Sequence, residues 1–211
     1  MKIDFVSDVV CPWCVIGLRS LEVALERTGN GLQVEWHFQP FELNPQMPPE
    51  GQDIGEHLAE KYGATPEQGE RTREAIRARG EALGFTFRMD RRSRIVNTFD
   101  AHRLLHWAGL EGRQTALQHA LFRAYFSDGA DPSLHDVLVR AAINAGLDAE
   151  RAQQVLASGA YANEVRERER FYLSQGIHAV PAVIIDDRHL IQGGQPAEVF
   201  EQALRRIAAA A

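Results

Sequence analysis

Two cysteines stand three positions apart near the start of the chain, and the 211 residues contain no others. Pro12 and Trp13 lie between them, so the tetrapeptide reads Cys11-Pro12-Trp13-Cys14. A structural disulfide framework needs cysteines spread along a chain, and two close neighbours cannot build one. Two thiols at this spacing can instead close a small, reversible disulfide. The pair therefore predicts thiol–disulfide exchange.

The residues around the pair predict how its two thiols differ. Residues 2–7 alternate between polar and apolar side chains, which is typical of a strand, and apolar residues recur at helical spacing from Cys14 onward. Pro12 suits the first turn of a helix, which places Cys11 at about the N-cap. There its sulfur faces free backbone N–H groups and the positive end of the helix dipole, which stabilise a thiolate. We expect Cys11 to be the nucleophile and Cys14 to be the resolving thiol.

A zinc site and a pair of inert buried thiols are the other two explanations for such a tetrapeptide. A structural zinc site needs four ligands, and the sequence has neither a second cysteine pair nor a histidine close to the first. Burial alone gives no reason for a Pro-initiated helix directly after a strand. His102 and His106 share one helix face near Asp100, but no third ligand follows at a defined spacing. The sequence predicts no metal site.

The two ends of the chain carry the strand signals. Strands are predicted at 2–7 and 32–38 with a helix between them, and a crossover of this kind makes the two strands parallel. Three further elements close the chain, namely a buried strand at 181–186, a pairing strand at 189–192 and a helix to about Ala209.

Helix starts are the clearest signals in the middle of the chain. Thr65-Pro66-Glu67-Gln68 has the pattern of a capping box with Pro at the first helical position. Asp131 and Asp148 are further predicted N-caps. From about residue 52 to residue 175, these signals predict five to seven helices, and strand signals nearly vanish.

The outer segments are each too small to enclose a hydrophobic core, so the simplest architecture joins them into one sheet domain. This domain is discontinuous and comprises residues 1–44 and 176–211, and residues 45–175 form a helical domain inserted between its halves. The Pro-rich, polar segment 45–49 is typical of a boundary. The predicted fold class is α/β.

Several motifs together resemble a known family. The strand followed by Cys11-Pro12-Trp13-Cys14, the long helical insertion and the late Val180-Pro181 resemble the DsbA family of thioredoxin-fold oxidoreductases. Three further segments are similar to the FrnE-like subgroup of that family, namely Ile16-Gly17, Asn97–Arg103 and Gly194-Gln195-Pro196. The resemblance spans nearly the whole chain and implies a thioredoxin fold with a large inserted all-helical domain.

The resemblance also implies a site around the cysteine pair. The Val180–Pro181 peptide bond would be cis and would face the tetrapeptide, and the backbone of residue 180 would pair with an extended substrate segment. Without the resemblance, the residues favour a simpler role for Pro181, as the proline that opens a strand. They likewise favour Asn97 or Thr98 as the cap of a helix. Six residues are expected to bind substrate, namely Pro12, Trp13, Val180, Pro181, Asn97 and His102.

We therefore predict a thiol–disulfide oxidoreductase that oxidises, reduces or isomerises disulfides. Its substrates are thiols or disulfides, in proteins or in small molecules. The Cys11–Cys14 disulfide is the redox group, no other cofactor is expected, and glutathione is a conceivable co-substrate.

Two other functions share this architecture. Hydroxychromene-carboxylate isomerases and kappa-type glutathione transferases bind glutathione, but those isomerases characteristically have Ser at the active position, so Cys14 argues against them. A non-catalytic binding module would use the same groove without chemistry, and the intact tetrapeptide disfavours it.

The composition excludes several classes of protein. Hydrophobic residues make up 45% and charged residues 25%, which excludes a disordered chain and a collagen-like fibre. The formal net charge of −6 disfavours a nucleic-acid partner. The apolar runs are far shorter than the roughly 20 residues of a membrane span. Asp4 and Asp8 interrupt what a signal peptide would need as its apolar stretch, so with Met1 as the native start we expect a cytoplasmic protein.

The proton acceptor for the second cysteine departs from the pattern of thioredoxin-like proteins. Such proteins often carry a buried acid on the first strand, six residues before the first cysteine. That position is Phe5 here. Asp4 fits only if the turn carries an extra residue, and Asp8 is predicted to lie in the turn itself.

Four arginines cluster between residues 88 and 94, namely Arg88, Arg91, Arg92 and Arg94. Such a run is usually a solvated loop, and a site for an anionic substrate is the alternative.

Overall fold

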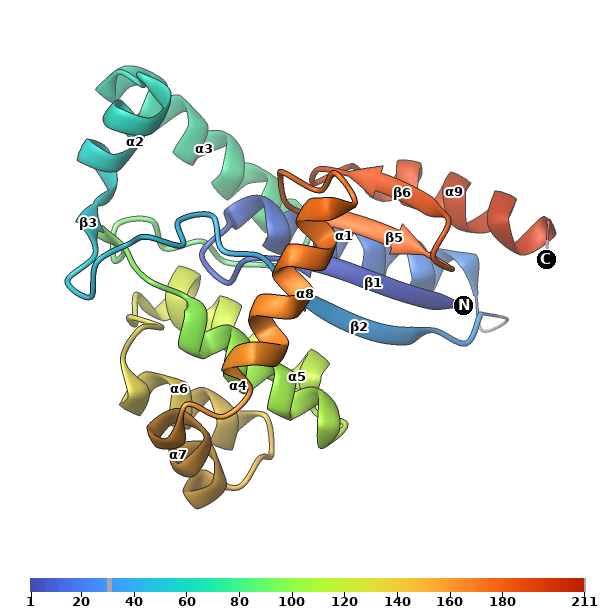
Figure 1. Ribbon diagram of the computed structural model, residues 1–211. Coiled ribbons are helices and arrows are strands. Elements are labelled where there is room, and N and C mark those ends of the chain that lie inside the picture. Colours follow the sequence, from blue (N-terminus) through green and yellow to red (C-terminus); the bar gives the residue numbers. More distant parts are fainter. Residues whose placement is uncertain (30–31, 211) are drawn as a thin grey trace.

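A four-stranded sheet forms the centre of the computed structural model, which describes residues 1–29 and 32–210 (Figure 1). Residues 30, 31 and 211 fall within the predicted sheet domain but lie outside the described residues. The strands follow the order β2 (Glu35–Pro40), β1 (Lys2–Ser7), β5 (Ala182–Ile185) and β6 (His189–Gln192).

The pairing of β1 joins the two ends of the chain. It runs parallel to β2 and antiparallel to β5, so Phe5 lies between Phe38 and Val183. Phe5 is fully buried, as expected for the middle strand of a sheet that is covered on both faces. The antiparallel β5–β6 hairpin turns at Asp186 and Asp187, which both have positive φ. The predicted parallel crossover at the start of the chain is confirmed.

Helices cover both faces of the sheet. On one face, α1 (Pro12–Thr28) packs along α9 (Ala197–Ala209) (Figure 1). On the other face, α8 (Ala162–Ser174) crosses in front of the strands and contacts β2 together with α4 (Phe99–Leu110). The cysteine pair therefore starts a helix that is held between the sheet and its neighbours.

Between residues 52 and 175 the chain is mainly helical, with seven α-helices and one π-helical segment. The elements not yet named are β3 (Gln52–Asp53), α2 (Ile54–Tyr62), α3 (Pro66–Ala82), β4 (Arg94–Ile95), α5 (Gln114–Arg123), η1 (Ala124–Asp128), α6 (His135–Asn144) and α7 (Ala149–Ser158). The predicted number of helices is confirmed, and so is the capping box at Thr65.

Two local predictions are wrong, and one short pair of strands is missed. The second strand occupies residues 35–40 rather than 32–38. The short antiparallel pair β3–β4 was not predicted, because two residues per strand are too few to show alternation. Asp131 does not begin a helix. Its side chain accepts hydrogen bonds from the backbone and the hydroxyl of Ser133 in a turn, and α6 begins later, at His135.

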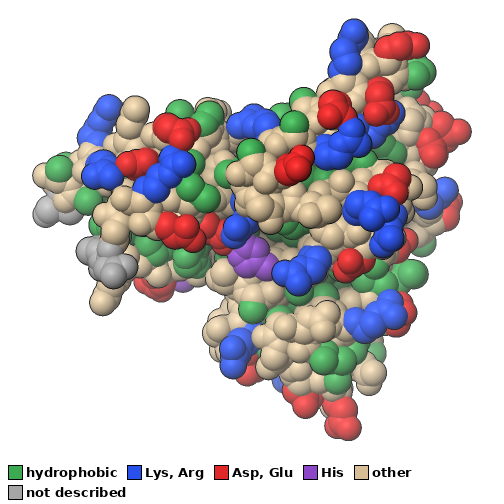
Figure 2. Space-filling view, turned by 180° about the vertical axis from the view of Figure 1, so that it is seen from behind, with side chains coloured by type: hydrophobic (Ala, Val, Ile, Leu, Met, Phe, Trp, Pro, Cys, Tyr) green, Lys and Arg blue, Asp and Glu red, His purple; other side chains and the backbone are tan. Residues whose placement is uncertain are grey.

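One hydrophobic cluster extends from the sheet into the helical segment. It contains Phe5 of β1, Leu104 of α4 and Phe126 of η1, all fully buried. Charged side chains of both signs are interspersed over the surface seen in Figure 2. Within the described residues, no helix is both long enough and apolar enough to cross a bilayer.

Candidate active site

The cysteine pair lies at the junction of β1 and α1. Cys11 is the N-cap of α1, and Pro12 is the first residue of the helix, as the sequence predicts. Both side chains are buried, with Cys11 3% exposed and Cys14 fully buried, and no disulfide joins them in this structure. The backbone N–H of Cys14 donates to the carbonyl of Cys11 at 3.1 Å, which closes the first turn.

The environments of the two thiols differ. Burial raises the pKa of the Cys14 thiol well above its ordinary value, and the adjacent Cys11 sulfur raises it further. Cys14 therefore keeps its proton until a base removes it. Cys11 stands at the N-terminal end of the helix, where its side chain makes no capping hydrogen bond.

The segment at Val180 and Pro181 faces the pair. The Val180–Pro181 peptide bond is cis, and the Cys11 thiol donates to the Val180 carbonyl at 3.8 Å. Gly17 in the second turn of α1 permits this approach. A Cβ at Gly17 would lie 2.9 Å from Cγ of Pro181, so a larger side chain would push the two segments apart.

Trp13 is held from two sides. The guanidinium of Arg79 on α3 lies 5.3 Å from the ring centroid, and Arg79 also donates to the carbonyl of Gly194 at 2.9 Å. A Cβ at Gly194 would approach the carbonyl oxygen of Trp13 to 3.0 Å. The glycine pair Gly193–Gly194 thus lets the chain pack against the tetrapeptide.

A cavity of about 700 Å³ opens beside Cys11. Its walls come from the tetrapeptide, the segment after β2, helices α2 and α3, the stretch between α3 and β4, and the loop at 178–180. Four of the predicted substrate-binding and catalytic residues line it, namely Cys11, Pro12, Trp13 and Val180. Because it contains the nucleophile, this cavity is the place where a substrate sulfur can reach the pair.

Asn97 and His102 are placed elsewhere. The side-chain oxygen of Asn97 accepts from the backbone N–H of Phe99 at 2.9 Å, so Asn97 caps the start of α4. His102 is 3% exposed and lies behind the cysteine pair, with its Nε2 3.2 Å from the carbonyl oxygen of Phe41. Neither residue is part of the cavity lining beside Cys11.

Asp8 is a buried acid in the turn between β1 and α1, and it is one of the two acids, with Asp4, that the sequence left open as the proton acceptor. It is 1% exposed, and one carboxylate oxygen accepts from the backbone N–H of Leu43 at 2.7 Å. The other oxygen lies 3.6 Å from Nε2 of His102. Burial lowers the pKa of His102, but the neighbouring carboxylates, Asp8 before Glu169 and Glu42, outweigh burial and leave that pKa raised. The charge of Asp8 also contributes to the raised pKa of Cys14.

Neither of the other two positions supplies a comparable acid. Phe5 carries no acid, and Asp4 is engaged at the far side of the sheet, where it accepts from the side-chain amide of Gln39 at 2.6 Å and pairs with Lys2 at 3.0 Å. The turn between β1 and α1 folds Asp8 back over the pair, since the Cys11 N–H donates to the Asp8 carbonyl at 3.1 Å.

The comparisons with known proteins agree with this geometry. The DSBA-like thioredoxin domain family matches residues 2–205. The chain belongs to this family. The resemblance to the DsbA family and the thioredoxin fold inferred from it are thereby confirmed.

This chain is similar to three proteins along nearly its whole length. The crystal structure of a probable DsbA oxidoreductase from Streptomyces coelicolor is 38% identical, with a TM-score of 0.89, 98% of this chain and 89% of that chain covered. The uncharacterized protein YwbO of Bacillus subtilis (strain 168) is 28% identical over 97% of this chain and 96% of its own. The cytosolic disulfide reductase DsbM from Pseudomonas aeruginosa with GSH is 18% identical, with a TM-score of 0.68 over 99% and 100% of the chains, and shares the fold.

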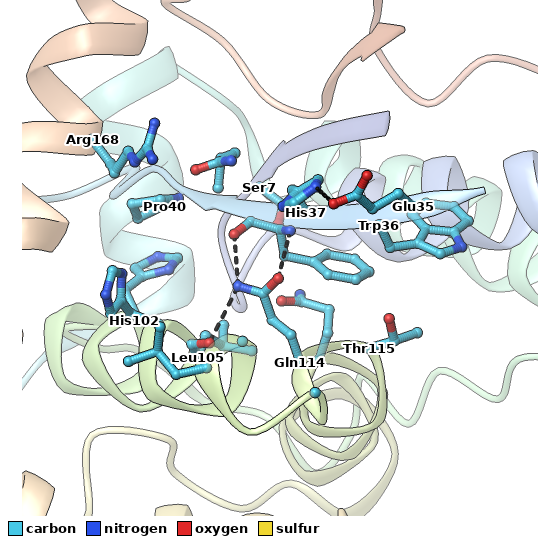
Figure 3. Close-up of a pocket in the computed structure, with 17 residues that line it drawn as sticks. Ser7, Glu35, Trp36, His37, Pro40, His102, Leu105, Gln114, Thr115 and Arg168 are labelled. Atoms are coloured by element: carbon cyan, nitrogen blue, oxygen red, sulfur yellow. Dashed lines mark hydrogen bonds and ion pairs between the residues drawn. The ribbon is translucent and has the colours of Figure 1, made fainter. Parts of the chain in front are cut away.

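A second cavity, of about 570 Å³, lies at the edge of β2 in this DSBA-like fold (Figure 3). The side-chain amide of Gln114 donates to the carbonyl of Phe38 and accepts from its N–H, both at 2.9 Å, and so completes the open edge of the strand. His102 lines this cavity and contacts Asp8 on its other side. The cavity contains neither cysteine, so we assign the chemistry to the cavity beside Cys11.

The histidine–aspartate group considered for a metal is not assembled. His102 pairs with Asp8, the ring of His106 packs against Tyr161, and Asp100 pairs with Arg103 and His135. Within residues 1–29 and 32–210, no three such side chains gather in a way that could hold a metal ion.

A buried carboxylate pair adjoins the active-site cavity, and the sequence did not reveal it. Arg166 of α8 forms ion pairs with both Glu42 and Glu169, whose other carboxylate oxygens are buried without a hydrogen-bond partner. Glu42 lines the cavity beside Cys11. Burial and the neighbouring Glu169 raise the pKa of Glu42 to about 7, against the opposing effects of His102 and Arg166. More than 120 residues separate the partners, so no local pattern could indicate the pair.

The raised pKa of Glu42 predicts that the stability of the protein depends on pH. A carboxyl group whose pKa rises on folding binds its proton more tightly in the native state. Its contribution to stability is present below its ordinary pKa of 4.5 and is lost as the pH rises to about 7. Glu42→Gln removes this ionisation. The free energy of unfolding of the variant minus that of the wild type should therefore rise by about 2 kcal/mol as the pH increases from about 5 to about 8. Urea unfolding at both pH values measures the difference.

Glu50→Gln, at an exposed glutamate, is the matched control and should show the same difference from the wild type at both pH values. A Glu42→Gln variant that behaves like this control would contradict the raised pKa.

Proposed function

We propose that this protein catalyses thiol–disulfide exchange through Cys11 and Cys14. The observation that carries the proposal is the placement of Cys11 as the N-cap of α1 at the wall of a cavity, with Cys14 buried one turn behind it. Its membership in the DSBA-like family and its relationship to a probable DsbA oxidoreductase support this function.

Two displacements complete one reduction cycle. The Cys11 thiolate attacks a substrate disulfide, so a Cys11–substrate disulfide forms and one substrate thiolate leaves. Cys14 then loses its proton to a base and attacks the Cys11 sulfur, which forms the Cys11–Cys14 disulfide and releases the second thiolate. The reverse sequence oxidises a substrate dithiol. The pair itself carries the two electrons, so no other cofactor is required, and glutathione would serve as a co-substrate.

The finer assignments rest on the sequence motifs. Ile16-Gly17, the stretch 97–103 and Gly194-Gln195-Pro196 support placement in the FrnE-like subgroup. The roles of Val180 and Pro181 in holding an extended substrate segment are supported by their position opposite Cys11.

A redox titration tests the proposed function. The protein is equilibrated in buffers of defined thiol to disulfide ratio, and the fraction of free thiol is measured by alkylation and mass spectrometry. We expect one reversible two-electron transition between about −270 and −120 mV, the span of thioredoxin-fold dithiols. Cys11→Ser should show no such transition. A pair that stays reduced across this range, or that oxidises irreversibly, would overturn the proposal.

A further inference from the structure

One arginine of the cluster between residues 88 and 94 lies in the active-site cavity. Arg88 pairs with Asp90 at 2.9 Å on the surface. Arg94 donates to the carbonyls of Glu50 and Gly51 at 2.7 and 2.9 Å. Arg92, in contrast, lines the same cavity as Cys11. The structure thus separates Arg92 from its neighbours in sequence.

The guanidinium of Arg92 lacks a carboxylate partner. Within the described residues, its Nε and Nη1 atoms are shielded from solvent and have no hydrogen-bond partner. The rings of Tyr125 and Phe126 lie 5.1 and 5.2 Å from it and supply cation–π contacts. Burial lowers the pKa of Arg92, since desolvation disfavours the charged form. Arg92 as a whole is only partly buried, but part of its charge is shielded from water without a partner, and an entering anion would offset the cost of that desolvation.

The remainder of the cavity matches an anion that also has an apolar part. Several apolar side chains line it, among them Ile54, Leu58, Ile76, Met89 and Ile95. The lining also holds Lys61, the histidines His57 and His178, and Arg73, which already pairs with Glu70 at 2.6 Å. The acid that faces them, Glu42, already pairs with Arg166. The volume of about 700 Å³ is in the range of cavities that enclose a small molecule.

We propose that Arg92 binds the carboxylate of a small thiol or disulfide substrate, whose apolar part occupies the cavity while its sulfur meets Cys11. This inference rests on the proposed function and names its substrate class. The guanidinium is a charged donor, and charge-assisted hydrogen bonds to a carboxylate are strong where water is excluded.

Two aromatic disulfides of similar size test the proposal. Dithiobis(nitrobenzoate) carries carboxylates, and dithiodipyridine is neutral at pH 7.5. With either probe, Cys11 displaces one aryl thiolate and Cys14 displaces the second, so the enzyme dithiol is oxidised and the probe is reduced to two aryl thiols. Absorbance of the released thiol gives the second-order rate constant for each probe.

For Arg92→Gln, we expect the rate constant with the carboxylate probe to fall at least tenfold and that with the neutral probe to change less than twofold. Arg92→Lys keeps the charge without the planar fork and should fall between the wild type and Arg92→Gln. Arg88→Gln, in the same cluster but outside the cavity, should match the wild type with both probes. Thermal unfolding of each variant confirms that the protein is folded.

Three outcomes would overturn the assignment of Arg92. Equal slowing with both probes, together with a shifted pH profile, would mean that Arg92 acts on the Cys11 thiolate instead. Equal rates in Arg92→Gln and wild type, or equal slowing in Arg88→Gln, would also overturn it. If the wild-type protein releases no aryl thiol from either probe, the proposed function itself fails.

Discussion

Replacing Cys14 with Ser should trap substrates on Cys11 as mixed disulfides. In the proposed cycle, Cys14 acts only after Cys11 has formed its bond with the substrate. A hydroxyl cannot displace that bond, so the covalent complex should persist until a reductant is added. Incubation of Cys14→Ser with glutathione disulfide, followed by mass spectrometry of the intact protein, should show one added glutathione that dithiothreitol removes.

Cys11→Ser is the matched control, because its remaining thiol is fully buried and should form no adduct. The wild-type protein should show only a transient adduct before its own disulfide closes. A glutathione-dependent isomerase or transferase would not require a second thiol. Turnover of that kind in Cys14→Ser, without any adduct, would contradict the resolving role of Cys14.

Local sequence signals were sufficient for the elements that position the nucleophile. Alternation identified β1, and Pro12 between a strand and an apolar helical run placed Cys11 at the N-cap, where the structure has it. The Thr65 capping box predicted the start of α3. These signals succeed because hydrophobic period and capping chemistry are properties of neighbouring residues.

The residues that surround the cysteine pair could not be predicted from local sequence signals. The resemblance to the DsbA family predicts His102 as a substrate-binding residue, yet it lies behind the cysteine pair against Asp8. Arg92 was one of four similar arginines in sequence, and only the folded chain distinguishes it. Glu42 meets Arg166 through the packing of α8 on the sheet. Such contacts depend on tertiary structure, which no short window of sequence contains.

Asp8→Asn should slow the second displacement while leaving the first nearly unchanged. Cys14 is fully buried, and its raised pKa keeps it protonated, so its attack on the mixed disulfide requires a base. Asp8 is buried beside the pair, and His102 on its other side leads to the cavity at the edge of β2. A proton taken by Asp8 therefore has a route away from Cys14.

The expected loss is about tenfold to hundredfold in the rate of the second step near pH 7, at or below the lower limit of the range for general base catalysis. The loss of rate is partly offset because Asp8→Asn also removes a charge that raises the pKa of Cys14. Raising the pH should restore the rate, since Cys14 then ionises without the base. Acid-quenched reactions with glutathione disulfide, analysed by mass, separate the formation of the mixed disulfide from its decay.

Asp4→Asn provides the matched control, because Asp4 is also a buried acid, within β1, but binds Gln39 and Lys2 instead. This variant should show wild-type rates for both steps. Equal slowing in Asp4→Asn and Asp8→Asn would indicate a general effect of removing a buried acid. Slowing of the first step in Asp8→Asn would instead indicate that Asp8 positions Cys11. The backbone carbonyl of Asp8 accepts a hydrogen bond from the Cys11 N–H. Accumulation of the mixed disulfide in Asp8→Asn alone would identify Asp8 as the proton acceptor for Cys14.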